Sequence, residues 1–184
     1  MNSGIVSYRY ASALLKYADE TGNGEIVYRQ VVQLSKELES VSRLRALIDN
    51  PSAVPGSMKT DLCEAALGGN MADELKKFIR LVIKNKRMKY LRFILFSFIS
   101  QYRKTHKIKV CRLVTAVPSD GLEKRIASIV EGRTGDSVVF EHRVDPEIIG
   151  GFVVELGGYR MDASTVSQLK AVRRQFIEKN RRIV

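Results

Sequence analysis

Along the first hundred residues, hydrophobic side chains recur at steps of three and four, the spacing that places them on one face of an α-helix. Turns that contain glycine or proline interrupt this pattern, so it divides into consecutive helices. The first predicted helix carries its apolar stripe from Val6 to Tyr17, the second from Val27 to Val41, and the fourth lies around Met58, Leu62 and Ala66. The third, fifth and sixth span about residues 42–49, 72–85 and 88–106. Six amphipathic helices joined by short connections predict a helical bundle.

After Lys109 the pattern changes to β-branched and other strand-forming residues. Strands are predicted at 110–117, 138–144, 152–156 and 159–161, with Gly157-Gly158 as a tight turn between the last two. One helix follows Pro118-Ser119-Asp120 and ends near Gly132. A final helix begins near Ala163-Ser164 and carries Leu169, Val172 and Phe176. The predicted fold class is α+β, with an N-terminal six-helix bundle in residues 1–105 and a small α/β domain in residues 106–184.

Charge adds information about possible partners. The 184 residues include 31 Lys and Arg against 20 Asp and Glu, a net charge of +11, and both halves are basic. Such a protein attracts anionic polymers, anionic membranes or acidic protein surfaces. Basic residues cluster after the fifth helix (Lys84, Lys86, Arg87, Lys89, Arg92) and in the last helix (Arg173, Arg174, Lys179, Arg181, Arg182). The simpler interpretation is solvated helix ends that complement the helix dipole. The alternative is a basic nucleic-acid-binding module.

The residues that catalysis or cofactor binding would require are not grouped in this sequence. Cys63 and Cys111 are too few for a disulfide framework, and we expect free thiols. Glu141 and His142 are neighbours in a predicted strand, so their side chains face opposite sides. The segment 132–137 lacks the spacing of a phosphate-binding loop, and the most apolar window, 90–99, is about half of the roughly 20 residues that a membrane span needs. We predict no catalytic residues, no metal and no cofactor.

The most specific pattern in the chain is VVFEHRVDPEIIGGFVVELG at residues 138–157. It resembles the signature of the delta subunit of F-type ATP synthases, called the oligomycin-sensitivity-conferring protein in mitochondria. The matching residues are Val138, Phe140, Val144, Asp145, Ile148, Gly150, Gly151, Phe152, Val154, Glu155 and Gly157. We expect this signature to be mainly structural, since its glycines permit tight turns and positive φ.

Other segments resemble the same family in order and position. They are YASAL at 10–14, the Asn50-Pro51 break, KFIRLVIKNKR at 77–87, VTAVP at 114–118, and Asp162-Ala163-Ser164 at the start of the last helix. Within the third of these, Lys86 stands where a glycine is usual. The resemblance therefore covers nearly the whole chain.

This resemblance implies a non-catalytic stator subunit that links the catalytic head of the ATP synthase to the peripheral stalk, so that rotation is coupled to ATP synthesis and proton transport. In the family, the N-terminal bundle binds the N-terminal segments of the alpha subunits and the C-terminal domain binds the b subunit. One copy per complex is expected, with no nucleic acid and with the membrane contacted only through the complex. The bundle starts within a few residues of Met1, so we expect no transit peptide and a bacterial protein at the cytoplasmic face of the inner membrane.

The resemblance also indicates where the partners bind. An amphipathic partner helix needs an apolar groove between two bundle helices, and the first and fifth helices form that groove in the family. We expect it to be bordered by Tyr10, Ala13, Leu14 and Tyr17 on one side, and by Leu75, Ile79, Val82 and Ile83 on the other. The alternative for each is a role in the bundle core alone; partial exposure of Ile83, which lies beside the core stripe, would favour the groove. The expected b-subunit contacts are Arg173 and Arg174.

Overall fold

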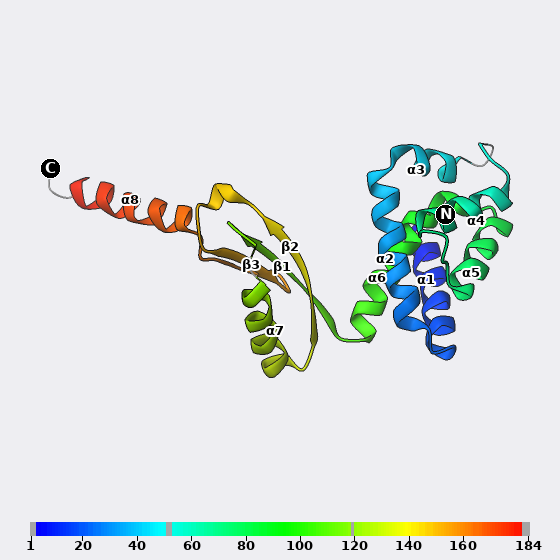
Figure 1. Cartoon of the computed structure of the whole chain (residues 1–184), viewed down its shortest axis with the longest axis horizontal. Helices are drawn as coiled ribbons and strands as arrows, with labels where there is room; N and C mark the ends of the chain where they lie inside the picture. The colour runs from blue at the N-terminus through cyan, green and yellow to red at the C-terminus, as the bar shows by residue number, and fades with distance from the viewer. Residues whose placement is uncertain (1–2, 51–52, 119, 182–184) are drawn as a thin grey trace. The chain divides into compact units, whose positions relative to one another are not determined.

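The computed structural model describes residues 3–50, 53–118 and 120–181. Pro51, Ser119 and Arg182, which enter the sequence predictions, lie outside the described residues. The chain divides into two compact units, Met1–Thr105 and His106–Val184, and each is described by itself (Figure 1). The first is helical and the second contains a four-stranded mixed sheet with helices, so the predicted α+β fold class is confirmed.

The helical unit contains the six predicted helices. They are α1 (Ser3–Glu20), α2 (Gly24–Ser40), α3 (Ser42–Asp49), α4 (Gly56–Ala66), α5 (Asp73–Lys84) and α6 (Leu91–Thr105). The last differs from the prediction of one helix over 88–106, because its first turn is a separate 3₁₀ helix, η1 (Met88–Tyr90). There the Tyr90 N–H bonds to the carbonyl of Arg87 three residues earlier, which is the tighter 3₁₀ pattern.

The core of this unit is built around α6, which packs against α1 and α2 (Figure 1). On α6, Leu91, Ile94, Leu95 and Phe98 are fully buried. Tyr102 extends the core and stacks on Tyr28 of α2, with ring centroids 4.4 Å apart. Full burial of one such side chain stabilises the fold by about 1.5–3 kcal/mol relative to exposure, so the helical unit has a substantial core of its own.

The second unit is a sheet in the order β2-β1-β3-β4. Its elements are β1 (Ile108–Thr115), α7 (Asp120–Thr134), β2 (Ser137–Val144), η2 (Pro146–Ile148), β3 (Phe152–Leu156), β4 (Tyr159–Asp162) and α8 (Thr165–Arg181). β1 and β2 are parallel, with α7 as the crossover between them, whereas β3 pairs antiparallel with both β1 and β4.

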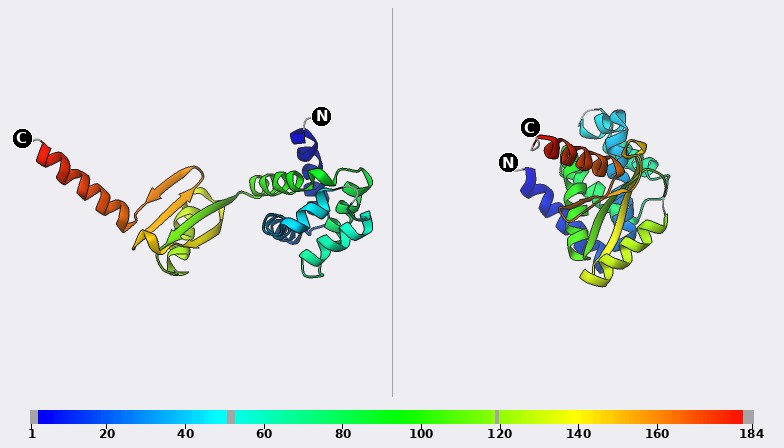
Figure 2. Two further views of the ribbon diagram at one scale, coloured as in Figure 1. Left: turned by 90° about the horizontal axis from the view of Figure 1, so that it is seen from above. Right: turned by 90° about the vertical axis from the view of Figure 1, so that its left-hand side faces the viewer.

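The two faces of this sheet differ. The helix α7 covers one face of the sheet (Figure 2). On this face Cys111 and Leu113 of β1 are buried, as is Val130 of α7. On the opposite face, Arg112 lies between two carboxylates of the neighbouring strands, 3.2 Å from Glu141 Oε2 and 3.6 Å from Glu155 Oε2. The open face therefore carries a row of paired charges across three strands.

The signature segment joins β2, β3 and the start of α8. Gly151 has φ +75°, and a Cβ built there would lie 2.1 Å from the backbone oxygen of Ala163, so no side chain fits. The neighbouring Gly150 carbonyl accepts a hydrogen bond from the Thr165 N–H at 2.9 Å. Before them, the Asp145 carboxylate caps η2 by accepting from the Glu147 N–H. The close approach of backbones at Gly151 thus fixes where α8 begins.

Candidate partner-binding surfaces

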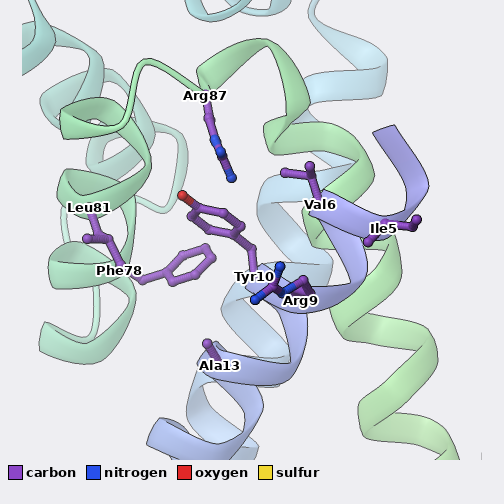
Figure 3. A pocket seen from close by; sticks show the side chains of 8 residues that line it. All are labelled: Ile5, Val6, Arg9, Tyr10, Ala13, Phe78, Leu81 and Arg87. Atoms are coloured by element: carbon purple, nitrogen blue, oxygen red, sulfur yellow. The ribbon is translucent and has the colours of Figure 1, made fainter. Parts of the chain in front are cut away.

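A pocket of about 490 Å³ opens between α1 and α5 (Figure 3). It is lined by Ile5, Val6, Arg9, Tyr10, Ala13, Phe78, Leu81 and Arg87. The first five come from α1, the next two from α5, and Arg87 from the turn after α5. Most of these side chains are apolar, and the two guanidinium groups are the charged ones. We call this site the α1–α5 groove.

Tyr10 forms the central wall of the α1–α5 groove and is held from three directions. Its ring and the Phe78 ring form a T-shaped pair with centroids 6.2 Å apart. The Arg87 guanidinium carbon lies 5.3 Å from its centroid, in cation–π geometry (Figure 3). Its hydroxyl accepts a hydrogen bond from Asn85 Nδ2 at 2.8 Å. The pocket wall is therefore preorganised, which reduces the entropic cost of binding a partner.

At the rim of the groove, apolar side chains are exposed. Ile5 and Leu81 have exposed fractions of 59% and 47%, and they lie on opposite walls beside the apolar pocket. Exposed apolar surface around a hollow is typical of a protein interaction site. Arg9 and Arg87 add positive charge at the same site, so the groove is complementary to an amphipathic segment with apolar and acidic side chains.

The predicted groove residues occupy different places. Tyr10 and Ala13 line the pocket. Leu14, Leu75, Ile79 and Val82 are buried in the bundle core beneath it, and Tyr17 is half-buried with its hydroxyl 3.4 Å from Lys77 Nζ. Ile83 is half-buried but lines two other pockets, toward α4.

Sequence reasoning missed several residues that line the α1–α5 groove. The predicted set lacks Ile5, Arg9, Phe78, Leu81 and Arg87. Phe78 is in fact buried and also lines the pocket. Leu81 carried a signal in the sequence, because it is a large apolar residue of α5 outside the core stripe of Leu75, Phe78, Ile79 and Val82.

The second candidate surface is α8, which extends away from the sheet (Figure 2). Its side chains are exposed from Gln168 to Lys179. Its apolar residues Leu169, Val172, Phe176 and Ile177 are between 48% and 66% exposed, although their spacing places them on one helical face. Arg173 and Arg174, the predicted b-subunit contacts, are also exposed on this helix. An apolar stripe beside basic residues is typical of a helix that packs against a partner.

The start of α8 is firmly capped. Ser164 is buried, and its Oγ accepts from the Ser167 N–H at 3.2 Å. The Asp162 carboxylate accepts from the Ser164 N–H at 3.0 Å and from Ser167 Oγ at 2.9 Å. These hydrogen bonds favour the carboxylate and lower the pKa of Asp162. The helix is thus stabilised locally at its first turn even though its later turns are exposed.

His142 makes contacts that the sequence did not reveal. Its Nδ1 lies 2.9 Å from Glu123 Oε1 of α7, and its Nε2 lies 2.7 Å from Thr115 Oγ1 of β1. The Thr115 hydroxyl in turn donates to the Val117 carbonyl at 2.6 Å. The expectation that His142 does not pair with its neighbour Glu141 agrees with this geometry, but the partner carboxylate is 19 positions away in sequence. The network ties α7 to the sheet.

Both thiols are buried, and the described residues include no metal-binding cluster of three or more His, Cys, Asp or Glu side chains. Cys63 and Cys111 are buried and free, and burial raises the pKa of Cys63 to about 12. Within residues 3–50, 53–118 and 120–181, no cluster of three His, Cys, Asp or Glu side chains is arranged to hold a metal ion. Over the same residues, no helix has the length and apolar character to cross a membrane.

Comparisons with known proteins agree over nearly the whole chain. The family model for the ATP synthase delta (OSCP) subunit matches residues 6–176. The ATP synthase subunit delta of Phocaeicola vulgatus is 43% identical over 186 residues and covers 100% of both chains. That of Parabacteroides distasonis is 35% identical, over 97% of this chain and 99% of the relative. A chain in the cryo-EM structure of the Toxoplasma gondii mitochondrial ATP synthase hexamer has a similar fold, with a TM-score of 0.61, 23% identity, and coverage of 93% of this chain and 97% of that one.

Proposed function

Because the chain belongs to the ATP synthase delta (OSCP) subunit family, a non-catalytic stator component of the F-type ATP synthase, we propose that its two units bind two different subunits of that complex. The α1–α5 groove binds the N-terminal segment of an alpha subunit. The second unit binds the end of the b subunit. The chain then holds the catalytic head to the peripheral stalk while the central shaft rotates, which couples rotation to ATP synthesis and proton transport.

The observation that carries the alpha-subunit assignment is the preorganised apolar pocket between α1 and α5. Its volume of about 490 Å³ accommodates large apolar side chains. The exposed Ile5 and Leu81 at its rim lose their contact with water when a partner helix covers them. Arg9 and Arg87 lie where they can pair with acidic side chains of that helix.

The b-subunit assignment rests on α8 and the open sheet face. The exposed stripe of Leu169, Val172 and Phe176 supplies apolar contact area. Arg173 and Arg174 on the same helix attract an acidic segment. Because nothing in the described part of the second unit covers this stripe, a partner helix packed along it would complete the hydrophobic contacts of α8.

Location follows from this assembly. The relatives named above that share at least 35% identity are bacterial proteins, and the family is a component of ATP synthase. We therefore place the chain peripherally at the cytoplasmic face of the bacterial inner membrane, in one copy per complex, with its membrane association arising only through its partners. Family membership favours this role over the nucleic-acid-binding alternative.

The test of the alpha-subunit assignment is a calorimetric titration of the full chain with a peptide that copies the N-terminal segment of the alpha subunit, at low and high salt. We expect one-to-one binding that tolerates salt, because apolar burial drives it. Leu81→Asp should weaken it by at least about tenfold, or roughly 1.4 kcal/mol.

The matched control is Ile83→Asp, two positions away on the same helix but outside the α1–α5 groove. This control should bind the alpha peptide like the parent protein. Equal weakening by both substitutions would contradict the assignment. Loss of binding at high salt alone would instead indicate a charge-driven contact.

A further inference from the structure

A second groove lies along a different part of α5, toward α4. Two adjoining pockets of about 400 and 250 Å³ share Gly56 and Ile83 as lining residues. Neither pocket shares a lining residue with the α1–α5 groove. We call this pair of pockets the α4–α5 groove. This groove is separate from the two partner sites proposed above.

The centre of the α4–α5 groove is apolar. Ile83 of α5 lies between the two pockets, and Val54 and Met88 line the larger one. Gly56 at the start of α4 lets Ile83 pack closely against its backbone, since a Cβ built on this glycine would lie only 2.7 Å from Ile83 Cγ2. An apolar side chain of a ligand therefore finds matching surface at the middle of the groove.

The rim of this groove is cationic. Arg80 and Lys84 line the smaller pocket, and Lys86 and Lys89 line the larger one. Each pocket has one acidic lining residue, Asp61 in the smaller and Asp49 in the larger. None of these four cations forms an ion pair with a carboxylate in the described part of the chain. Their charge is therefore available to a ligand.

A fifth cation belongs to the wall of the larger pocket. Lys59 is only 3% exposed, and its Nζ donates to the carbonyls of Ile48 at 2.9 Å and Asn50 at 2.6 Å. These bonds hold the ammonium group at the end of α3. The Lys59 ammonium group adds positive potential to the groove, and its burial reduces the screening of this potential by salt.

Lys86 occupies a backbone conformation that favours glycine. Its φ is +54°, and it lies at the left-handed position after α5. There the Lys86 N–H bonds to the Ile83 carbonyl at 2.8 Å and the Arg87 N–H bonds to the Val82 carbonyl at 3.0 Å. A side chain is disfavoured at this position, so a lysine held there against its backbone preference points to a use for its charge.

We propose that the α4–α5 groove binds an acidic segment of a partner protein in which carboxylates flank an apolar side chain. The apolar side chain packs on Ile83 and the carboxylates pair with the rim cations, Lys86 among them. The apolar centre distinguishes this ligand from a bare phosphate, whose oxygens gain nothing from Ile83. Since the two grooves share no lining residue, we expect this partner and the α1–α5 ligand to be bound at the same time.

The test uses the full chain with isoleucine δ1-methyl groups labelled for NMR. The probe is a synthetic pentapeptide of two glutamates, one leucine and two glutamates, with blocked ends. We expect it to shift the Ile83 methyl signal and to leave that of Ile5, which lines the α1–α5 groove, in place. The same peptide with glutamine in place of glutamate should cause no comparable shift.

Variants at Lys86 separate charge from folding. Lys86→Gln and Lys86→Gly should each weaken the probe about two- to fivefold, the loss expected for one partly exposed charge pair. Lys86→Gly should melt no lower than the parent, because it relieves the positive φ. The matched control is Lys36→Gln, an exposed lysine on α2 that lines neither groove.

Several results would overturn the proposal. Equal binding of the glutamine peptide would exclude recognition of carboxylates, and a shift at Ile5 in place of Ile83 would assign the peptide to the other groove. Displacement of the peptide by an equal concentration of pyrophosphate would identify a general anion site. Leu81→Asp, which tests the alpha-subunit assignment, should leave the Ile83 response unchanged, so the two proposals fail independently.

Discussion

The two units of the molecule differ in how completely they bury their own hydrophobic stripes. In the helical unit, the core stripe of α6, which is Leu91, Ile94, Leu95, Phe98 and Tyr102, is buried, and α6 packs against α1 and α2, although Phe93 and Phe96 on other sides of the helix are exposed. In the second unit, the apolar residues of α8 are largely exposed, and the buried hydrophobic residues among those that the structure describes are Cys111, Leu113 and Val130. The first unit thus completes its core by itself, whereas the second presents an amphipathic helix whose apolar side is available to a partner.

Core truncation should produce the largest difference between the units. Phe98→Ala removes a fully buried ring and should lower the free energy of unfolding by about 3–5 kcal/mol. Leu169→Ala removes an exposed side chain from α8 and should change it by less than about 0.5 kcal/mol. Denaturant unfolding followed by circular dichroism compares the two. A large effect of Leu169→Ala would mean that α8 packs within its own unit.

A negative charge introduced into the exposed apolar stripe of α8 should weaken binding of the b-subunit peptide and leave the stability of the fold unchanged. Phe176→Asp places a carboxylate among the apolar residues of α8 and should cost about 2 kcal/mol of binding to a peptide copying the end of the b subunit, or about 30-fold in Kd. Gln168→Asp, also exposed on α8, is the matched control and should cost far less. The measurement is calorimetric titration, and equal losses in both variants would count against the apolar stripe as the contact.

The two buried cysteines report on the two units separately. Cys63 lies in the helical unit and Cys111 in the second, and burial raises the pKa of both thiols. Each therefore reacts with a thiol reagent chiefly when its unit opens. We expect the second unit to open more easily than the helical unit, because its buried core is smaller. An opening free energy that is lower by about 1.4 kcal/mol would make the modification of Cys111 about tenfold faster than that of Cys63.

Single Cys→Ala variants, one for each site, allow the two modification rates to be followed by mass spectrometry. The b-subunit peptide should slow the modification of Cys111 and leave Cys63 unaffected, because it stabilises only the unit to which it binds. If Cys63 were modified faster than Cys111, the helical unit would be the one that opens more easily, contrary to this prediction.

The smallest expected effect concerns a link within the helical unit. Glu74 of α5 accepts a hydrogen bond from Asn23 Nδ2 at 2.8 Å, and this bond is the main cause of its lowered pKa. A carboxyl whose pKa is lower in the folded state stabilises the fold above its ordinary pKa and loses this contribution as the pH falls through the folded value. Glu74→Gln should therefore cost about 1 kcal/mol at pH 7 and progressively less as the pH falls below 4.5.

Chemical denaturation at several pH values measures this dependence. Glu39→Gln, on an exposed residue near the end of α2, is the control and should change stability little at any of them. A cost of Glu74→Gln that stays constant down to pH 3 would show that the charged form of Glu74 contributes nothing. In the second unit, the hydrogen bonds that lower the pKa of Asp162 come from Ser164 and Ser167 nearby, so they stabilise a helix start and not the packing of distant elements.

Elements and their order were predictable because periodicity is a local property of the chain. The predicted helix at 42–49 and the strand at 152–156 coincide with α3 and β3. Contacts between distant segments were not accessible in this way. The pairing of His142 with Glu123 depends on how α7 packs on the sheet, and a strand pattern says nothing about that packing.

The candidate site was predictable only in part for a related reason. Periodicity distinguished the face of α5 that enters the core, so Ile79 and Val82 were recognised as apolar contacts, but it did not separate the groove floor from its rim. Leu81 and Arg87 became groove residues only once α1 was placed beside them. Ile83 was assigned to the same groove by its position next to the core stripe, yet it lines the pockets toward α4.

Binding of different partners by the two units can be tested by a crossed titration. The parent chain, Leu81→Asp and Phe176→Asp are each titrated with the alpha-subunit and the b-subunit peptides. If the two units bind different partners, Leu81→Asp should lose only the alpha peptide and Phe176→Asp should lose only the b peptide. This prediction would be contradicted if either substitution weakened both peptides equally, or if neither substitution changed binding.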